Sequence, residues 1–153
     1  MRDYRNGRDH DQTLNDFYRR ISEKIHIEPH LLVPVTHDIL GSLVRRLHYT
    51  SAAKLTSLLP KTLQEEFLDM PAGPDRSITV GTMIDGLVHR HNLKEPTARA
   101  TVLNFFSALE EMLPTEEIKT IKMQLPEEFR ALFVGLAKPT HPFRGPRETG
   151  NVA

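Results

Sequence analysis

The stretch that decides the fold is Gln124-Leu125-Pro126-Glu127-Glu128-Phe129-Arg130-Ala131-Leu132-Phe133. A proline is tolerated in the first turn of a helix because its missing N–H would have no intrahelical partner there. Phe129 and Phe133 follow, and their spacing of four places them on one face of a helix. The stretch therefore predicts that one helix ends before Pro126 and that a short helix begins there and packs through its phenylalanines.

A stretch of the same design, Leu58-Leu59-Pro60-Lys61-Thr62-Leu63-Gln64-Glu65-Glu66-Phe67, lies 66 residues earlier. It repeats the Leu-Pro step and the apolar residues three and seven positions after the proline. We call the two stretches the first (58–67) and second (124–133) Leu-Pro segments. We predict that both are structural and that the following residues hold a short helix against the core: Leu59, Pro60, Phe67, Leu125, Pro126, Phe129 and Phe133.

The similarity extends to the chain around the two segments. A shift of 66 residues aligns the halves without a gap and places Ile39 on Phe105 and Leu43 on Leu109. Identities are few, but apolar residues fall on apolar residues almost throughout, as a duplicated core requires. Any two amphipathic stretches would align at some register, yet the coincidence of both Leu-Pro steps favours duplication. The sequence thus predicts an all-α fold of two tandem four-helix repeats, packed as one eight-helix bundle without a sheet.

Composition divides the chain into five parts. Residues 1–12 are charged and lack apolar periodicity, which predicts a flexible N-terminal arm. The first repeat is expected over 13–70 and the second over 77–137. Residues 71–76 contain two prolines and a glycine and cannot continue a helix, so they are predicted to be a linker. Residues 138–153 are rich in proline and glycine, which predicts a disordered tail.

Local signals predict several helix ends. Pro34 falls inside an apolar stripe with helical spacing, so the second helix either begins near it or bends there. Residue types that cap helix N-termini occur at Tyr49-Thr50-Ser51, at Ser77 or Thr79, and at Thr115.

Two glycines, Gly41 and Gly86, lie inside predicted helices. Glycine is less stable than alanine in a helix by ~1 kcal/mol, so each position needs a compensating reason. We expect close approach of a neighbouring helix, with the lining of a pocket as the alternative for Gly86.

Composition limits the function classes. Lysine and arginine total 20, aspartate and glutamate total 20, and the formal net charge is zero, which disfavours a dedicated nucleic-acid binder. The sequence has no cysteine, so disulfides, thiol catalysis and thiolate metal sites are excluded. The N-terminal residues have no apolar run typical of a signal peptide, and no stretch reaches the ~18 apolar residues of a membrane span. We expect a soluble, cytoplasmic protein.

With its tandem halves, each ending in a Leu-Pro segment, the chain resembles the bacterial domain-of-unknown-function family 2267 (DUF2267). The resemblance covers roughly residues 12–136 and is best in the second Leu-Pro segment. It implies an all-helical, cytoplasmic bacterial protein, and it implies no activity, because the family has none assigned and provides no catalytic residues. The first half departs from the family pattern at Pro34 and in its looser Leu58-Leu59-Pro60 step.

Histidine is the only enriched reactive residue type, with eight residues in the chain. A metal site needs three or four ligands that converge. His30 and His37 are seven residues apart and could share a helix face, with His26 close by across a turn. These three residues are the metal candidates, and solvated or helix-capping histidines are the alternative. Asp38 points elsewhere by spacing.

Carboxylates occur in four adjacent pairs: Glu65-Glu66, Glu110-Glu111, Glu116-Glu117 and Glu127-Glu128. General acid–base catalysis needs carboxyl groups that converge in a cleft. These pairs lie on polar helix faces, mostly near helix N-termini, where the helix dipole favours them. The sequence also lacks a phosphate-binding glycine loop and a nucleophile elbow. We therefore expect no catalytic residue and no cofactor.

Three functions remain open. The first is a non-enzymatic module that binds another protein, or a second copy of itself, through a helix face or the groove between the repeats. The second is a small-ligand or metal-binding protein that uses the cleft between the repeats with His26, His30 and His37. The third is a DNA-binding regulator with a helix-turn-helix in residues 50–69, disfavoured because residues 61–67, its recognition helix, are acidic.

Overall fold

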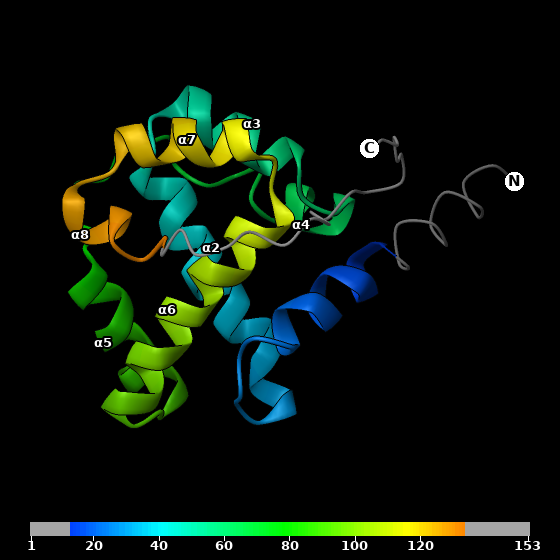
Figure 1. Cartoon of the computed structure of the whole chain (residues 1–153), viewed down its shortest axis with the longest axis vertical. Coiled ribbons are helices and arrows are strands. Elements are labelled where there is room, and N and C mark those ends of the chain that lie inside the picture. The colour runs from blue at the N-terminus through cyan, green and yellow to red at the C-terminus, as the bar shows by residue number, and fades with distance from the viewer. Residues whose placement is uncertain (1–12, 134–153) are drawn as a thin grey trace, which may run out of the picture.

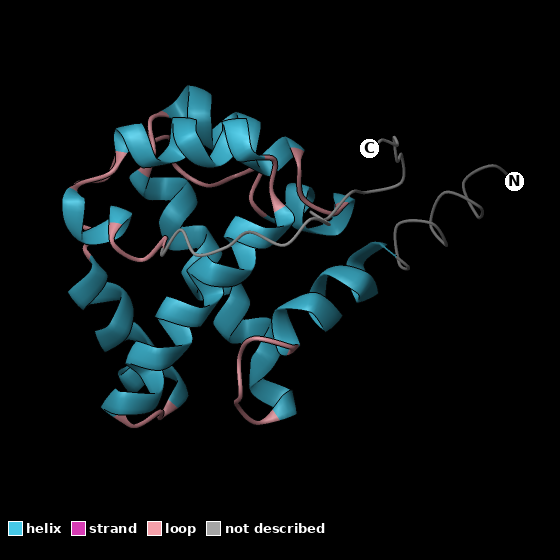
Figure 2. Ribbon diagram, viewed as in Figure 1, coloured by secondary structure: helices cyan, strands magenta, loops and turns pink. Residues whose placement is uncertain are grey.

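Two long helices, α2 (Leu32–Arg46) and α6 (Glu95–Met112), lie at the centre of the molecule, and shorter helices surround them (Figure 1). The computed structural model describes residues 13–133, which form eight α-helices and no strand (Figure 2). The remaining elements are a first helix (residues 13–22), the 3-10 helix η1 (Pro29–Leu31), α3 (Tyr49–Ser57), α4 (Lys61–Glu66), α5 (Val80–His91), α7 (Thr115–Gln124) and α8 (Glu127–Arg130). The predicted all-α class is confirmed; the arm at 1–12 and the tail at 138–153 lie outside the described residues.

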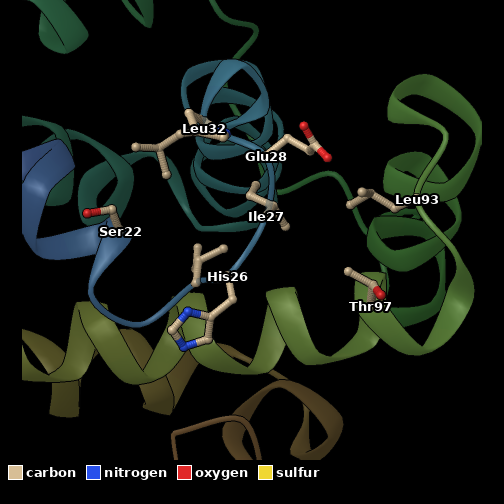
Figure 3. A pocket seen from close by; sticks show the side chains of 9 residues that line it. Ser22, His26, Ile27, Glu28, Leu32, Leu93 and Thr97 are labelled. Atoms are coloured by element: carbon tan, nitrogen blue, oxygen red, sulfur yellow. The ribbon is translucent and has the colours of Figure 1, made fainter.

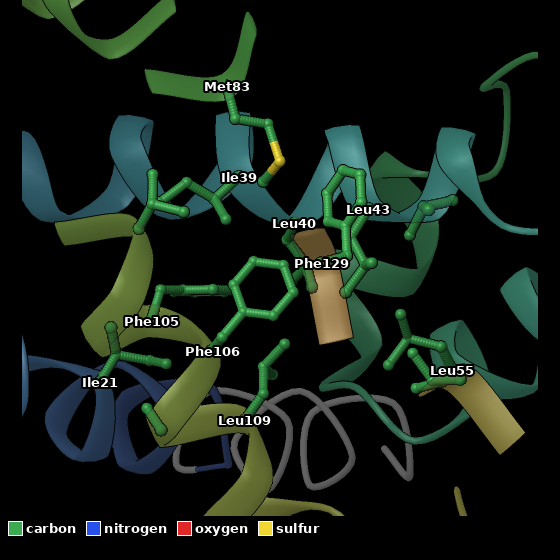
Figure 4. Packing of buried hydrophobic residues seen from close by; sticks show 14 of the residues in the cluster. Ile21, Ile39, Leu40, Leu43, Leu55, Met83, Phe105, Phe106, Leu109 and Phe129 are labelled. Carbon is green, nitrogen blue, oxygen red and sulfur yellow. The ribbon is translucent and has the colours of Figure 1, made fainter. Parts of the chain in front are cut away.

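Residues 13–70, the first half, and residues 77–133, the second half, share one hydrophobic core. Side chains of α2 and α6 meet in it, together with the phenylalanines of the second Leu-Pro segment (Figure 4). The ring centroid of Phe106 lies 5.0 Å from that of Phe133 and 6.4 Å from that of Phe129. Offset and edge-on aromatic pairs at such distances add stability beyond the area that they bury. The core therefore ties the second Leu-Pro segment to α6 at the centre of the molecule.

Prolines precede three of the shorter helices. Pro60, Pro114 and Pro126 are the N-caps of α4, α7 and α8, with φ between −55° and −63° and ψ between 146° and 165°. The carbonyl of each proline accepts the first intrahelical bond, and the restricted φ of proline suits this conformation. The prediction that Pro60 and Pro126 occupy the first turn is wrong by one position, because each stands just before the helix.

Pro34 is the third residue of α2, so this helix begins near the proline, the first of the two predicted possibilities. The three residues Pro29–Leu31 ahead of it form η1, in which the backbone N–H of Leu32 donates to the carbonyl of Pro29. In the first turn, Pro34 removes a donor that has no intrahelical partner.

The capping predictions are confirmed at one helix and wrong at two. Thr79 caps α5 in a reciprocal arrangement with Thr82. The cap of α3 is His48, one residue before the predicted group, because its Nδ1 accepts from the N–H of Thr50 at 3.3 Å. Thr115 is the first helical residue of α7, and its neighbour Pro114 holds the N-cap position instead.

The segment at 71–76 lies against the C-terminal end of α2. The N–H of Asp75 donates to the carbonyl of Arg45 at 2.8 Å, and a Cβ on Gly73 would lie 2.2 Å from the same oxygen. Hydrogen bonds from Ser77 to Asp75 lower the pKa of this carboxyl. Only a glycine at position 73 allows the two backbones to approach this closely.

Within residues 13–133, no helix is both long and apolar enough to cross a membrane.

Candidate functional site

A cavity of about 870 Å³ opens between the two halves of the molecule (Figure 3). One wall is the chain between the first helix and α2, and the other is the turn between α5 and α6 with the start of α6. We call this cavity the inter-half groove; it is lined by Ser22, Ile25, His26, Ile27, Glu28, Pro29, Leu32, Leu93 and Thr97.

The sequence builds each wall by ending a helix. On one side, Ile25 donates its N–H to the carbonyl of Ile21 and is buried, and the chain leaves the first helix with His26 and Glu28 exposed. On the other side, Asn92 ends α5 with a positive φ of 56°. Asparagine tolerates this left-handed conformation better than most residues, and the turn that it makes leads directly to Leu93.

The inter-half groove has an apolar floor and a polar edge. Ile27, Leu32 and Leu93 are half-buried and pack against the core. His26 and Thr97, which Figure 3 also labels, are exposed. Such a surface can accept an apolar group and hydrogen-bond a polar one beside it.

The three histidines predicted to bind metal lie in different surroundings. His26 lines the inter-half groove, and His30 belongs to η1. The Nε2 of His37 is 2.9 Å from the carboxylate of Glu66, and its ring centroid is 5.9 Å from that of Phe67. Within residues 13–133, no group of three or more histidine, aspartate or glutamate side chains is arranged to hold a metal ion.

A polar cluster that the sequence did not predict joins α2 to α5. The Oδ2 of Asp38 lies 2.5 Å from the Nε2 of His91 and 3.1 Å from the Nε of Arg90. The spacing in the sequence predicted that Asp38 points away from the histidines of its own half. In the structure, Asp38 contacts His91, a histidine of the other half. A Cβ on Gly86 would lie 2.4 Å from the guanidinium of Arg90, on the same helix. The atoms nearest to that Cβ belong to a flexible side chain of α5 itself, and the close approach of a neighbouring helix at Gly86 stays a prediction.

The other helical glycine, Gly41, is also closest to a side chain rather than to a helix backbone. A Cβ at this position would lie 2.7 Å from the Cε of Met70 and 3.7 Å from the ring of Phe67. The end of the first Leu-Pro segment therefore packs directly on α2.

The second member of every carboxylate pair makes a contact to another element. Glu66 pairs with His37, Glu111 with Lys24, and Glu117 with Lys54, while the carboxylate of Glu128 accepts from the N–H of Val80 at 3.4 Å. These contacts link α4 to α2, α6 to the chain after the first helix, α7 to α3, and α8 to α5. The carboxylate pairs therefore stabilise contacts between elements, in addition to their favourable interaction with the helix dipoles.

The second Leu-Pro segment also makes polar contacts with the first half. Gln124, at the end of α7, accepts a hydrogen bond from the N–H of His48 at 3.1 Å and donates one to the Oγ of Ser51 at 2.6 Å. One glutamine thus satisfies groups at the N-terminus of α3, where a helix has unpaired donors.

Fold and groove together define a class: an all-α protein in which two halves share a core and enclose a groove with a mixed apolar and polar lining. The chain belongs to the family described as "Uncharacterized conserved protein (DUF2267)", whose model matches residues 15–132. The predicted family is confirmed. Comparisons with curated proteins and with solved structures found no match.

Proposed function

We propose that this protein is a non-catalytic interaction module that binds a segment of another protein in the inter-half groove. The observation that carries the proposal is the lining of the groove, in which Ile27, Leu32 and Leu93 form an apolar floor beside exposed polar residues. Protein interfaces have this anatomy, with an apolar centre and a polar rim. From the family resemblance we infer that the module acts in the bacterial cytoplasm.

The carboxylates support a non-enzymatic role. Catalytic acids and bases converge on one point of a cleft. Here Glu66, Glu111, Glu117 and Glu128 are each engaged in a contact between separate elements. Their positions serve the packing of the helices, which leaves binding as the function that the groove supports best.

We further propose that the chain is a tandem duplication. Together η1 and α2 cover residues 29–46, and 66 added to both numbers gives 95–112, the residues of α6. The N-caps correspond in the same way, His48 with Pro114 and Pro60 with Pro126. Boundaries that recur at one offset support two copies of the same four-helix plan.

A side-chain contact repeats at the same offset. In the first half, the Nε2 of Gln64 donates to the carbonyl of Leu59 at 2.8 Å. In the second half, the Nη1 of Arg130 donates to the carbonyl of Leu125 at 2.6 Å. Gln64 and Arg130 are 66 residues apart, and so are Leu59 and Leu125. Two different residue types therefore hydrogen-bond to the corresponding carbonyl, that of the leucine before the proline.

Binding of a small ligand is a second candidate, because the volume of the inter-half groove lies within the ~300–1,000 Å³ typical of small-molecule sites. His26 and Glu28 would then orient a polar group at the edge of the groove. Native mass spectrometry of the protein purified from its host separates the two candidates. A retained small molecule that Leu93→Asp removes would favour the second candidate.

The proposed function is tested by affinity capture from the native host with matched variants. Leu93→Asp puts a charge on the floor of the inter-half groove, whereas the control Leu103→Asp changes a residue of α6 that is 40% exposed and does not line it. The proposal expects a protein that the wild type and Leu103→Asp both retain and that Leu93→Asp loses. Equal retention by all three proteins would contradict binding in the groove.

A further inference from the structure

A second hollow lies on the first half, away from the inter-half groove. Its volume is about 390 Å³, and α2, α3, α4 and residues 67–73 surround it. We call it the α3–α4 hollow; it is lined by Val44, Tyr49, Ala52, Ala53, Thr56, Ser57, Gln64, Phe67, Leu68, Met70, Pro71, Ala72 and Gly73. None of these described lining residues is an aspartate, glutamate, lysine, arginine or histidine, although such charged residues are frequent in the chain.

The second half carries charges where the first half has this hollow. Residues 66 positions after Val44, Ala53, Thr56 and Gln64 are, in order, Glu110, Lys119, Lys122 and Arg130. Four positions that line the hollow in the first half are therefore uncharged, whereas the corresponding positions of the second half are charged.

One of these differences has a direct structural effect. In the second half, the Nζ of Lys122 lies 5.9 Å from the ring centroid of Phe133, which it covers. The residue at the corresponding position of the first half is Thr56, which is too short to reach as far. Both Thr56 and Phe67, the counterpart of Phe133, line the hollow. The ring of Phe67 therefore lacks the lysine that covers the corresponding ring of Phe133.

Exposed apolar side chains stand at the edge of the α3–α4 hollow. Leu68 is 77% exposed and Tyr49 is 59% exposed, and both line it. Burial of a leucine side chain is favourable, and apolar surface that gathers on one face indicates an interaction site. The hollow and the side chain that could fill such a hollow are therefore neighbours on one face.

We propose that this face binds a second copy of the chain about a two-fold axis, with Leu68 of each copy in the α3–α4 hollow of the other. A two-fold interface uses the same patch on both copies, so the patch must contain both the projecting group and its receptor. The described lining of the hollow carries no charged residue, so a leucine from a second copy would enter it without removing a lining charge from water. The formal net charge of zero removes long-range repulsion between copies.

Sedimentation velocity of the full chain, from about 1 µM to about 1 mM, tests the proposal over the range of weak and moderate affinities. The wild type is expected to show a concentration-dependent dimer. Leu68→Asp should weaken its dissociation constant at least ~tenfold, because a carboxylate would enter an apolar hollow. The control Met123→Asp changes a residue that is 82% exposed and does not line the hollow, and it should leave the constant unchanged.

Thr56→Lys provides a second variant that introduces the residue of the second half at the same position. It should cover Phe67 as Lys122 covers Phe133, and it should also abolish the dimer. Circular dichroism and thermal unfolding of each variant establish that it is folded. A wild type that stays monomeric throughout, or a dimer that survives both Leu68→Asp and Thr56→Lys, would overturn the proposal.

The outcome is independent of the inter-half groove. Leu93→Asp should leave the dimer intact, and Leu68→Asp should still capture the groove partner. Loss of only one of the two activities therefore identifies which proposal has failed.

Discussion

Phe133 is the last residue that the structure describes, and it is buried, with 4% of its surface exposed. It packs on the ring of Phe106 and lies under Lys122. We predict that Phe133→Ala lowers the free energy of unfolding by about 3–5 kcal/mol, since it removes a buried ring and leaves a cavity. Urea unfolding measures the loss, and the exposed Leu103→Ala is the control. A loss below about 1 kcal/mol would mean that the second Leu-Pro segment does not stabilise the core.

Thr36 is fully buried in α2, and its hydroxyl has no hydrogen-bond partner among residues 13–133. The residue 66 positions on is Val102, which is also buried. Because an unpaired buried hydroxyl costs about 1–3 kcal/mol, Thr36→Val should stabilise the protein by roughly 1 kcal/mol. Ser51→Ala is the contrasting variant, since it removes a hydroxyl that accepts from Gln124, and it should destabilise. A less stable Thr36→Val would contradict the reasoning.

The phenol of Tyr18 gives stability a dependence on alkaline pH. Burial, followed by the charge of Glu66, raises the pKa of Tyr18 from 10.0 to about 12. The folded state therefore holds this proton more tightly than the unfolded state, so the contribution is full below pH 10.0 and is lost as pH rises toward 12. The free energy of unfolding of Tyr18→Phe should fall less between pH 10.0 and about 12 than that of the wild type. The control Tyr49→Phe changes an exposed tyrosine and should behave as the wild type; identical profiles for all three proteins would refute the assignment.

At the scale of the elements, Gln124 couples α7 to α3 across the two halves. We predict that Gln124→Ala costs about 1–2 kcal/mol, because it leaves the N–H of His48 and the hydroxyl of Ser51 without this partner. Equilibrium unfolding measures the cost. Thr120→Ala is the control, because Thr120 is exposed and bonds only within its own helix. Equal effects of the two substitutions would show that the contact does not couple the halves.

Sequence reasoning located the elements because their determinants are local. The prolines of both Leu-Pro segments, the apolar spacing within each helix and the Pro- and Gly-containing segment at 71–76 each act on neighbouring residues. The same reasoning missed the cap at His48, since a histidine accepts there only in one tautomer and is a rare N-cap. It also missed the joining of Asp38 to His91, which depends on how α2 packs on α5.

The inter-half groove illustrates the same limit. Its residues His26 and Leu93 are 67 positions apart in sequence and line one cavity only after folding. The sequence anticipated a cleft between the halves and named His26, but we did not predict Leu93 as part of a site. Its neighbour Asn92, with a residue type that favours positive φ, was the available signal.

At the scale of the whole molecule, the two halves provide two different surfaces. Their shared core leaves the inter-half groove where the halves meet, and the α3–α4 hollow lies on the first half. We therefore assign partner binding to the junction of the halves and self-association to the face of the first half that carries the hollow.

Site-specific photo-crosslinking in the native host tests whether a partner protein binds in the inter-half groove. A photoreactive residue at Thr97, on the edge of the inter-half groove, is compared with one at Leu103, which is on the same helix and does not line the groove. Partner binding in the groove predicts one discrete protein adduct from position 97. This adduct should be absent from position 103 and abolished by Leu93→Asp. No adduct from position 97, or an adduct that Leu93→Asp leaves unchanged, would contradict it.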